Sequence, residues 1–394
     1  MSSPTKRSAW VDFSSRLVAK WRLNTQDVKQ SAEPELVGML SDLVSLPTVT
    51  GQYDANHDAL DYIERFVAER GMHVVRHEWN GVESLIATTK VTKTPTVMLA
   101  AHIDVLPAPE ASFQLTEKDG KLYGRGVLDM KFAIATYLKL VDSLADNLQD
   151  YDFGIMITTD EEAGGYDGVV RLIEAGYIPK VCVLPDGGDN WQVQIHAKGA
   201  LGFTLSATGK ASHGSRPWLG ENAVLRLMDA IRDIYALFPE HMGPRTNTVS
   251  IGKIQGGNAI NQVADSAELL LDVRVLTEAE HARLLAEIEA ICERHDVQAA
   301  LTWDIPVTEF DLKDPYIKPF ADIIQEVTGT VVKGSRTTGT NDIRFFKPHN
   351  TPCISFYPPG DGHHGPIEWI DKQALYDTAE IVEQYIRRMA KVQP

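Results

Sequence analysis

The chain is poor in cysteine and has no long hydrophobic run. Its 394 residues include three cysteines, Cys182, Cys292 and Cys353, which lie far apart and form no CxxC pair. Neither a disulfide framework nor a thiolate metal site is therefore expected. No apolar stretch approaches the roughly 20 residues that a membrane-spanning helix needs, and the first 15 residues lack the apolar core of a secretory signal. We expect a cytoplasmic protein with no membrane partner.

Basic residues are also in deficit. Lys and Arg number 38 against 54 Asp and Glu, which gives a formal net charge of −16. Nucleic-acid binding requires clustered Lys and Arg that neutralise phosphates, so the composition argues against a nucleic-acid partner. It argues equally against an anionic membrane surface. Hydrophobic residues make up 43% and charged residues 23%, as in ordinary globular proteins. At this length, two domains are expected.

Helical and extended patterns alternate in the first half of the chain. Apolar residues at helical spacing predict helices over 10–29, 34–46, 57–70, 131–144 and 168–175. Short β-branched or apolar runs predict strands over 73–78, 84–89, 96–101, 154–159 and 181–184. Strands separated by helices indicate an α/β fold with a mixed, largely parallel sheet flanked by helices. The ligand site of such a sheet lies beyond the carboxyl ends of its strands.

A different pattern separates two stretches of this α/β type. Strands predicted over 201–208, 246–254, 267–275 and 297–303, with helices over 221–237 and 277–294, have the β-α-β-β-α-β order of a small ferredoxin-like α+β unit. After it, helices are predicted over 315–327 and 372–392 and strands over 330–332 and 353–356. We predict one α/β domain, residues 1–197 and 311–394, that is interrupted by an inserted domain at 198–310.

Histidines and carboxylates follow several of the predicted strands. His102 and Asp104 come at the end of one strand, the acids Asp160-Glu161-Glu162 follow the next, and Asp186 follows a third. Asp129 stands in a glycine-flanked loop just before a helix. Each fragment alone has a simpler interpretation, namely a surface His-x-Asp pair, a solvated acidic turn or a helix N-cap. Together they place metal-ligand side chains where the topology predicts a site.

The residue types narrow the chemistry of that site. Asp361-Gly362-His363-His364 adds paired histidines in a Gly/Pro-rich loop. Imidazole mixed with carboxylate suits Zn, Co or Mn, whereas an all-oxygen set would suit Mg or Ca. Two histidines with at least three carboxylates exceed what one tetrahedral ion takes, so an acid shared by two ions accounts for the number. Two such ions suit hydrolysis by a bridging water, with a spare carboxylate as general base.

The motifs occur in the order seen in one known family. The chain resembles the dinuclear-zinc amidohydrolases that include acetylornithine deacetylase, succinyl-diaminopimelate desuccinylase, aminoacylase, glutamate carboxypeptidase and carnosine-type dipeptidases. The resemblance covers nearly the whole chain and runs through residues 102–107, 124–131, 160–162, 186, 209–222, 339–344 and 364–368. It implies a zinc-peptidase-like catalytic domain and gives the inserted domain the role of a lid or dimerisation domain.

Site roles follow from this resemblance by position. It implies two divalent metal ions per subunit, with His102 and Asp186 on one ion, Glu162 and His364 on the other, and Asp129 on both. Glu161 matches the general base, and Asp104 matches the residue that orients His102. His364 is preferred to His363 as the ligand because it stands four residues before Glu368, the family's spacing.

The resemblance also assigns residues to the substrate. His213 matches a histidine that reaches the active site of a partner subunit in many relatives, while a simpler interpretation is an exposed loop histidine. Asn261 and Arg274 match polar groups that hold the substrate carboxylate, for which the Arg fork is suited, although Arg274 on an alternating strand also fits a surface charge. Gly339 and Thr340 match backbone and hydroxyl contacts near that carboxylate.

These expectations define one function and three alternatives. The main expectation is hydrolysis of an amide or peptide bond in a small N-acyl amino acid or short peptide, by a chain able to form a homodimer through its inserted domain. Asp186 stands where deacylases and desuccinylases usually carry Glu, which favours a di- or tripeptidase or carboxypeptidase. Residues 199–222, in contrast, favour a desuccinylase. A non-catalytic metal-binding member of the fold and a Mg-dependent phosphatase are the alternatives of other classes, but no basic phosphate-binding loop is evident.

Overall fold

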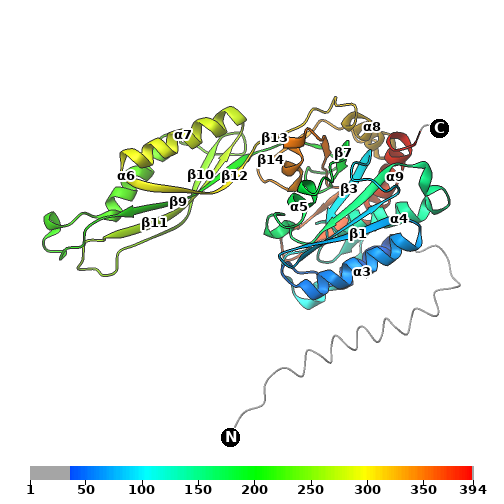
Figure 1. The fold of residues 1–394 in the computed structure, drawn as a ribbon, viewed down its shortest axis with the longest axis horizontal. Helices are drawn as coiled ribbons and strands as arrows, with labels where there is room; N and C mark the ends of the chain where they lie inside the picture. Colours follow the sequence, from blue (N-terminus) through cyan, green and yellow to red (C-terminus); the bar gives the residue numbers. More distant parts are fainter. Residues whose placement is uncertain (1–35, 393–394) are drawn as a thin grey trace, which may run out of the picture.

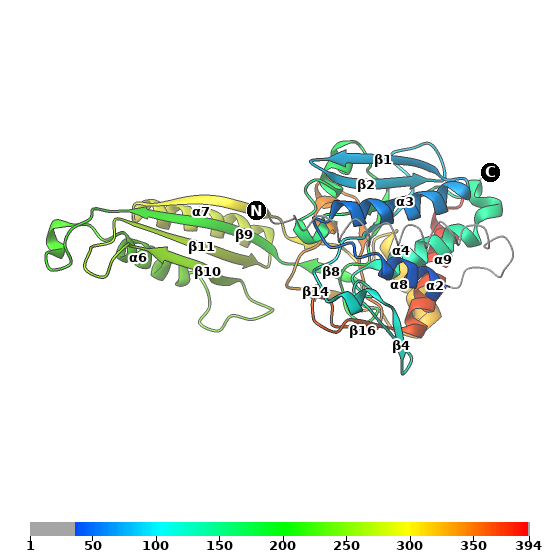
Figure 2. The same cartoon turned by 90° about the horizontal axis from the view of Figure 1, so that it is seen from below.

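A computed structural model describes residues 36–392. The helix predicted over 10–29 lies outside the described residues. The described part forms two lobes, a larger one around a six-stranded sheet and an elongated one around a four-stranded sheet (Figures 1 and 2). No helix within residues 36–392 is both long and apolar enough to cross a bilayer.

The sheet of the larger lobe is mixed and largely parallel, as the sequence predicted. Its order is β1-β2-β6-β3-β7-β15, with bounds β1 His73–Trp79, β2 Val82–Thr88, β6 Phe153–Thr158, β3 Val97–His102, β7 Val181–Val183 and β15 Cys353–Ile354. β6, β3, β7 and β15 are parallel to one another, and the hairpin β1–β2 is antiparallel. Every residue of β3 and β6 is buried, because helices cover the sheet and leave no face for alternating polar residues.

Helices surround this sheet and form its core with it. They are α2 Leu36–Ser45, α3 Tyr53–Glu69, α4 Lys131–Ser143, α5 Val169–Glu174, α8 Ile317–Thr328 and α9 Lys372–Met389. α3 packs on β1 and β2 and buries Ala59, Leu60, Ile63 and Val67, which recur at the helical period. α4, nearly all buried, packs on β3 and contacts α2, α3 and α9. The start of α4 is thereby fixed beside the end of β3.

The elongated lobe has the β-α-β-β-α-β order expected from the sequence. Its elements are β9 Gly199–Thr208, α6 Ala223–Tyr235, β10 Thr248–Gly256, β11 Ser266–Val275, α7 Glu278–Arg294 and β12 Val297–Ile305. The strands are ordered β10-β11-β9-β12 with every neighbour antiparallel, and α6 and α7 pack on the sheet (Figure 1). A hydrophobic core separate from that of the larger lobe joins the helices to the strands.

Two small sheets complete the described chain, and neither was predicted. One contains β8 Gln194–Ala197, β13 Thr308–Glu309 and β14 Ser335–Thr337, and the other contains β4 Thr116–Lys118, β5 Lys121–Tyr123, β16 Gly360–Asp361 and β17 Trp369–Asp371. The strand predicted over 330–332 is wrong. Pairing with β8 begins only at Ser335, after Gly334, whose φ of +81° breaks the extended run and whose position beside Ile195 leaves no room for a Cβ.

Candidate metal and catalytic site

The candidate site lies where three parallel strands of the large sheet end. His102 is the last residue of β3, Asp160 to Glu162 follow β6, and Asp186 follows β7. Because neighbouring parallel strands end at one edge of the sheet, these side chains lie close together. Asp129 joins them from the residue before the N-cap of α4, and His364 comes from the loop between β16 and β17.

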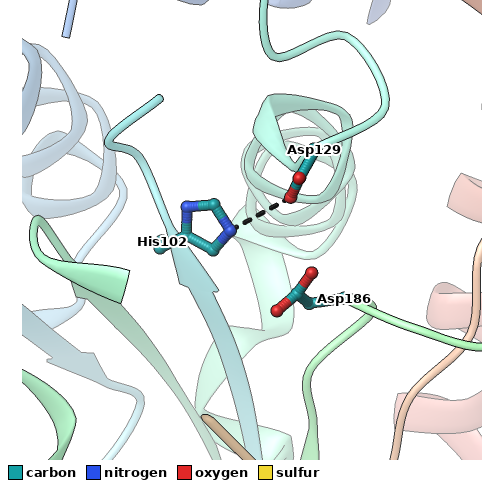
Figure 3. A group of neighbouring side chains, drawn as sticks. All are labelled: His102, Asp129 and Asp186. Carbon is teal, nitrogen blue, oxygen red and sulfur yellow. Dashed lines mark hydrogen bonds and ion pairs between the residues drawn. The ribbon is translucent and has the colours of Figure 1, made fainter. Parts of the chain in front are cut away.

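Three buried side chains form the first ligand group. His102, Asp129 and Asp186 each offer an atom within 4.8 Å of the others. They converge from β3, the start of α4 and the loop after β7, and His102 Nε2 lies 3.2 Å from Asp129 Oδ1 (Figure 3). Asp129 is 5% exposed and His102 2%. The surface-pair and N-cap interpretations therefore do not apply: both side chains are buried, and the N-cap position of α4 is Met130, with no side-chain cap.

A second ligand group shares Asp129 with the first. His364 Nε2 lies 3.1 Å from Asp129 Oδ2 and 3.2 Å from Glu162 Oε2. Asp129, Glu162 and His364 again offer atoms within 4.8 Å of one another. Each group thus combines one imidazole with two carboxylates, a donor set that suits Zn, Co or Mn. The structure brings the five predicted ligands together, and their role as ligands stays a prediction.

The electrostatics of the cluster favour a bound cation. Burial and the charge of Asp129 raise the pKa of Asp186, and burial and the charge of Asp186 raise the pKa of Glu161. Burial also opposes ionisation of Asp129, yet hydrogen bonds from His102 and His364 hold the pKa of Asp129 below its usual range. Buried carboxylates repel one another when all are ionised. A divalent cation in each group would stabilise the ionised forms of these acids.

Asp104 connects His102 to the acidic turn. His102 Nδ1 lies 2.9 Å from the backbone carbonyl of Asp104 and 3.6 Å from its Oδ1. The carboxylate of Asp104 accepts the backbone N–H groups of Glu161 and Glu162, each at 3.2 Å, and the hydroxyl of Thr50 at 3.0 Å. An anchored second ring nitrogen fixes the orientation of a ligand histidine. Asp104 is thus placed to orient His102 and also to hold the turn that carries Glu161 and Glu162.

Glu368 has a structural role that the sequence analysis missed. Its carboxylate accepts the backbone N–H groups of Gly126, Leu128 and Asp129 at 2.9, 2.8 and 3.0 Å. It also accepts a 3.0 Å bond from Arg125 Nη1. In the sequence, Glu368 served only as a spacing mark for His364. In the fold it ties the loop of Asp129 to the loop that carries His364.

Tyr357 is a second residue that the sequence analysis missed. Its hydroxyl donates to Asp186 Oδ1 at 2.6 Å. The ring of His363 packs against the Tyr357 ring with centroids 5.4 Å apart. His363 thus neighbours the site without joining either ligand group. Tyr357 comes shortly after the end of β15, and this position was the only signal in the sequence that pointed to it. A lone tyrosine among apolar residues predicts no role.

The predicted substrate residues lie in three places. His213 is exposed, and Gly214 beside it donates its N–H to the carbonyl of Asn261 at 2.6 Å. Their segments, 209–222 and 257–265, follow β9 and β10. They lie at the end of the elongated lobe's four-stranded sheet that is remote from the larger lobe (Figures 1 and 2). Within one chain, His213 and Asn261 are therefore apart from the ligand groups.

Arg274 and the pair Gly339-Thr340 are nearer the larger lobe. Arg274 lies near the carboxyl end of β11, at the opposite end of the sheet from His213 and Asn261. There its guanidinium makes two hydrogen bonds to the Asp272 carboxylate, at 2.7 and 2.8 Å. Gly339 and Thr340 follow β14 and directly precede Asn341, whose side-chain amide donates to the carbonyl of Asp186. The hydroxyl of Thr340 is buried and has no hydrogen-bond partner among the described residues.

Curated proteins resemble the chain over nearly its whole length. A succinyl-diaminopimelate desuccinylase of Caulobacter vibrioides is 29% identical over 388 residues, which cover 92% of this chain and 97% of that protein. A succinyl-diaminopimelate desuccinylase of Bordetella avium is 27% identical over 374 residues, covering 90% and 97%.

Solved structures share the fold. The aminopeptidase PepT of Bacillus cereus superposes with a TM-score of 0.73 at 20% identity, covering 90% of this chain and 98% of that one. An M20 family metallo-carboxypeptidase of Sulfolobus solfataricus gives a TM-score of 0.71 at 16% identity, covering 90% and 99%. The profile of peptidase family M20/M25/M40 matches residues 98–388, a span that contains every residue of both ligand groups. With the profile, the fold and the relatives in agreement, the chain belongs to peptidase family M20/M25/M40.

Proposed function

We propose that two divalent metal ions, zinc by preference and otherwise cobalt or manganese, bind the two ligand groups and that the chain hydrolyses N-acyl amino acids in the manner of a deacylase or desuccinylase. As a member of a metal-dependent family, the chain is a hydrolase of amide or peptide bonds. The observation that carries the proposal is the sharing of Asp129 by two groups of one histidine and two carboxylates. A shared carboxylate suits a pair of ions held close together.

The protein supplies the ligands and a proton carrier. When bound, such ions lower the pKa of water and polarise a carbonyl oxygen. Glu161 lies beside the ligand Glu162, and Asp104 fixes the backbone N–H groups of both residues. This neighbourhood supports the proposal that Glu161 takes a proton from the attacking water and gives it to the leaving amine. Burial, which raises the pKa of Glu161, favours this role because a general base works best with a pKa near the working pH.

The position of His213 supports a contribution from a second chain. His213 follows β9 at the end of the elongated lobe that is remote from the larger lobe, so within its own chain it does not lie beside the ligand groups. We propose that residues 198–310 form an inserted lid and dimerisation domain, and that His213 stabilises the oxyanion in the partner's site. Mixing His213→Ala chains with Glu161→Gln chains tests this directly. Recovery of activity in the mixture supports action between subunits, and an inactive mixture of confirmed heterodimers contradicts it.

A free carboxylate on the substrate would be held by Arg274, Gly339 and Thr340 of one chain, with Asn261 supplied, like His213, by the second chain. The guanidinium of Arg274 pairs with Asp272 through two bonds, so binding a substrate carboxylate requires Arg274 to exchange partners. The buried hydroxyl of Thr340 offers a donor close to the loop of Asp186. Arg binds a carboxylate through both oxygens, so Arg274 would give the site a preference for substrates with a free carboxyl group.

A di- or tripeptidase or carboxypeptidase activity is the second candidate. The specific observation in its favour is Asp186 in place of the longer Glu, and the fold is shared with an aminopeptidase and a metallo-carboxypeptidase. A hydrolysis screen with N-succinyl amino acids, N-acetyl amino acids and dipeptides, each with Zn, Co and Mn, separates the two candidates. Faster turnover of the N-acyl substrates supports the proposal, and faster turnover of dipeptides supports the alternative.

The Glu161→Gln variant tests the mechanism and the non-catalytic alternative. We expect this variant to keep its ions and lose turnover, because the carboxamide cannot carry the proton. Glu110→Gln, on an exposed 3-10 helix Glu110–Phe113, is a matched control and should retain wild-type turnover. Near-native turnover of metal-loaded Glu161→Gln would contradict the role of Glu161. A wild-type chain that binds ions but hydrolyses no substrate of the screen would identify a non-catalytic member.

A further inference from the structure

We propose that Tyr357 is a positioning residue for the first metal ion. By donating to Oδ1 of Asp186, its hydroxyl would fix the orientation of this carboxylate and thereby set the metal affinity of the group formed by His102, Asp129 and Asp186. This inference rests on the proposed two-metal function and assigns a further residue to that site.

The register of the sheet places the two side chains together. β7 and β15 are parallel neighbours in which Cys182 is paired with Cys353. Asp186 and Tyr357 each come four residues after these partners, so both leave the sheet at the same edge. The N–H of Leu184 donates to the carbonyl of Ile354 at 2.9 Å, which extends the pairing toward the site. The contact between Tyr357 and Asp186 is therefore built into the strand pairing.

The phenol is the hydrogen-bond donor that fixes the carboxylate of Asp186. Tyr357 Oη lies 2.6 Å from Oδ1, a short distance that is typical of a hydroxyl donating to a charged acceptor. The other contacts of Asp186 hold its backbone: its N–H donates to the carbonyl of Leu184 at 2.9 Å, and its carbonyl accepts from Asn341. Among the described residues, no other hydrogen bond reaches the Asp186 carboxylate. Without the phenol, no hydrogen bond from the described residues would fix the orientation of this carboxylate.

The phenol ring is itself held by the loop of the second group. The rings of His363 and Tyr357 lie with centroids 5.4 Å apart at an interplanar angle of 33°. His363 is adjacent in sequence to His364, a member of the second group. Tyr357 therefore contacts Asp186, a member of the first group, and His363, the sequence neighbour of a member of the second group. Partners that orient a ligand carboxylate in this way commonly change metal affinity by about 10- to 100-fold when removed.

Tyr357→Phe tests the proposal because it removes the hydroxyl and keeps the ring. The matched control is Tyr385→Phe on α9, which removes a hydroxyl that donates to the carbonyl of Tyr316 at 2.9 Å. Each protein is loaded with Zn or Co, dialysed against a series of chelator-buffered metal concentrations, and analysed for bound ions by mass spectrometry. The absorption spectrum of the Co form reports the ligand geometry.

The expected result is an asymmetric loss. Tyr357→Phe should bind one ion about 10- to 100-fold more weakly, keep the other at wild-type affinity and show an altered Co spectrum, while Tyr385→Phe binds both ions as the wild type does. The proposal is overturned if Tyr357→Phe keeps wild-type affinity for both ions, if it loses both equally, or if the control shows the same change. A wild-type chain that binds fewer than two ions would instead overturn the two-metal function and this inference with it.

Discussion

Replacing Glu368 by Gln should destabilise the protein strongly, although Gln has nearly the same size. Glu368 is 5% exposed, and its carboxylate accepts four hydrogen bonds, from three backbone N–H groups and from Arg125. Gln keeps one acceptor oxygen and places an NH2 group against donors that then lack a partner. The substitution also leaves the guanidinium of Arg125, itself 7% exposed, without its anion. Breaking a buried ion pair from one side costs about 3–5 kcal/mol.

Urea unfolding followed by circular dichroism measures this loss. Glu117→Gln is the control, because Glu117 pairs with Lys372 at 2.8 Å on the surface, with its side chain 49% exposed. Such exposed pairs contribute about 0–1 kcal/mol. We expect Glu368→Gln to lower the free energy of unfolding by about 3–5 kcal/mol and to weaken the binding of both ions, since Glu368 connects the two ligand loops. A loss no larger than that of the control would refute the role assigned to Glu368.

Three further predictions concern features outside the site. Gly38→Ala on α2 should raise the free energy of unfolding by about 0.5–1 kcal/mol, because an added Cβ meets nothing within 4 Å; a loss in urea unfolding would contradict this. Asn222→Ala should lower the free energy of unfolding by about 1 kcal/mol, because the Asn222 side chain caps α6 by accepting from two backbone N–H groups. An unchanged unfolding midpoint would argue against the cap. Cys182, Cys292 and Cys353 are all buried, and burial raises the pKa of Cys292 to about 11. Ellman's reagent at pH 8 should therefore label the thiols only after unfolding, and rapid labelling of the native protein would contradict that burial.

The sequence predicted that the candidate ligand side chains would lie together because strand ends and metal-ligand residue types coincide. His102, Asp129 and Asp186 are separated in the sequence, yet each follows a recognisable strand or precedes a recognisable helix, and parallel strands end at one edge. The sequence could not predict Tyr357 or the four bonds of Glu368. Those contacts join residues 171 and about 240 positions apart, and they depend on the register of strands and loops.

Local features explain what the sequence analysis missed in the fold. β4, β5, β16 and β17 have two or three residues each, too few to show a period. The strand predicted over 330–332 is a β-branched run, but Gly334 delays pairing until Ser335. His213 lies at the remote end of the elongated lobe because β9 runs away from the larger lobe. A sequence motif does not reveal the direction of a strand.

The most direct test of the shared-carboxylate site is the metal content of Asp129→Ala beside that of the wild type, measured by mass spectrometry after dialysis against buffered zinc. Asp129 belongs to both ligand groups, so its loss should weaken both. We predict about two ions per wild-type chain and tight binding of neither ion by Asp129→Ala. A wild-type chain that holds a single ion, or an Asp129→Ala chain that keeps either ion at wild-type affinity, would contradict a two-metal centre built on Asp129.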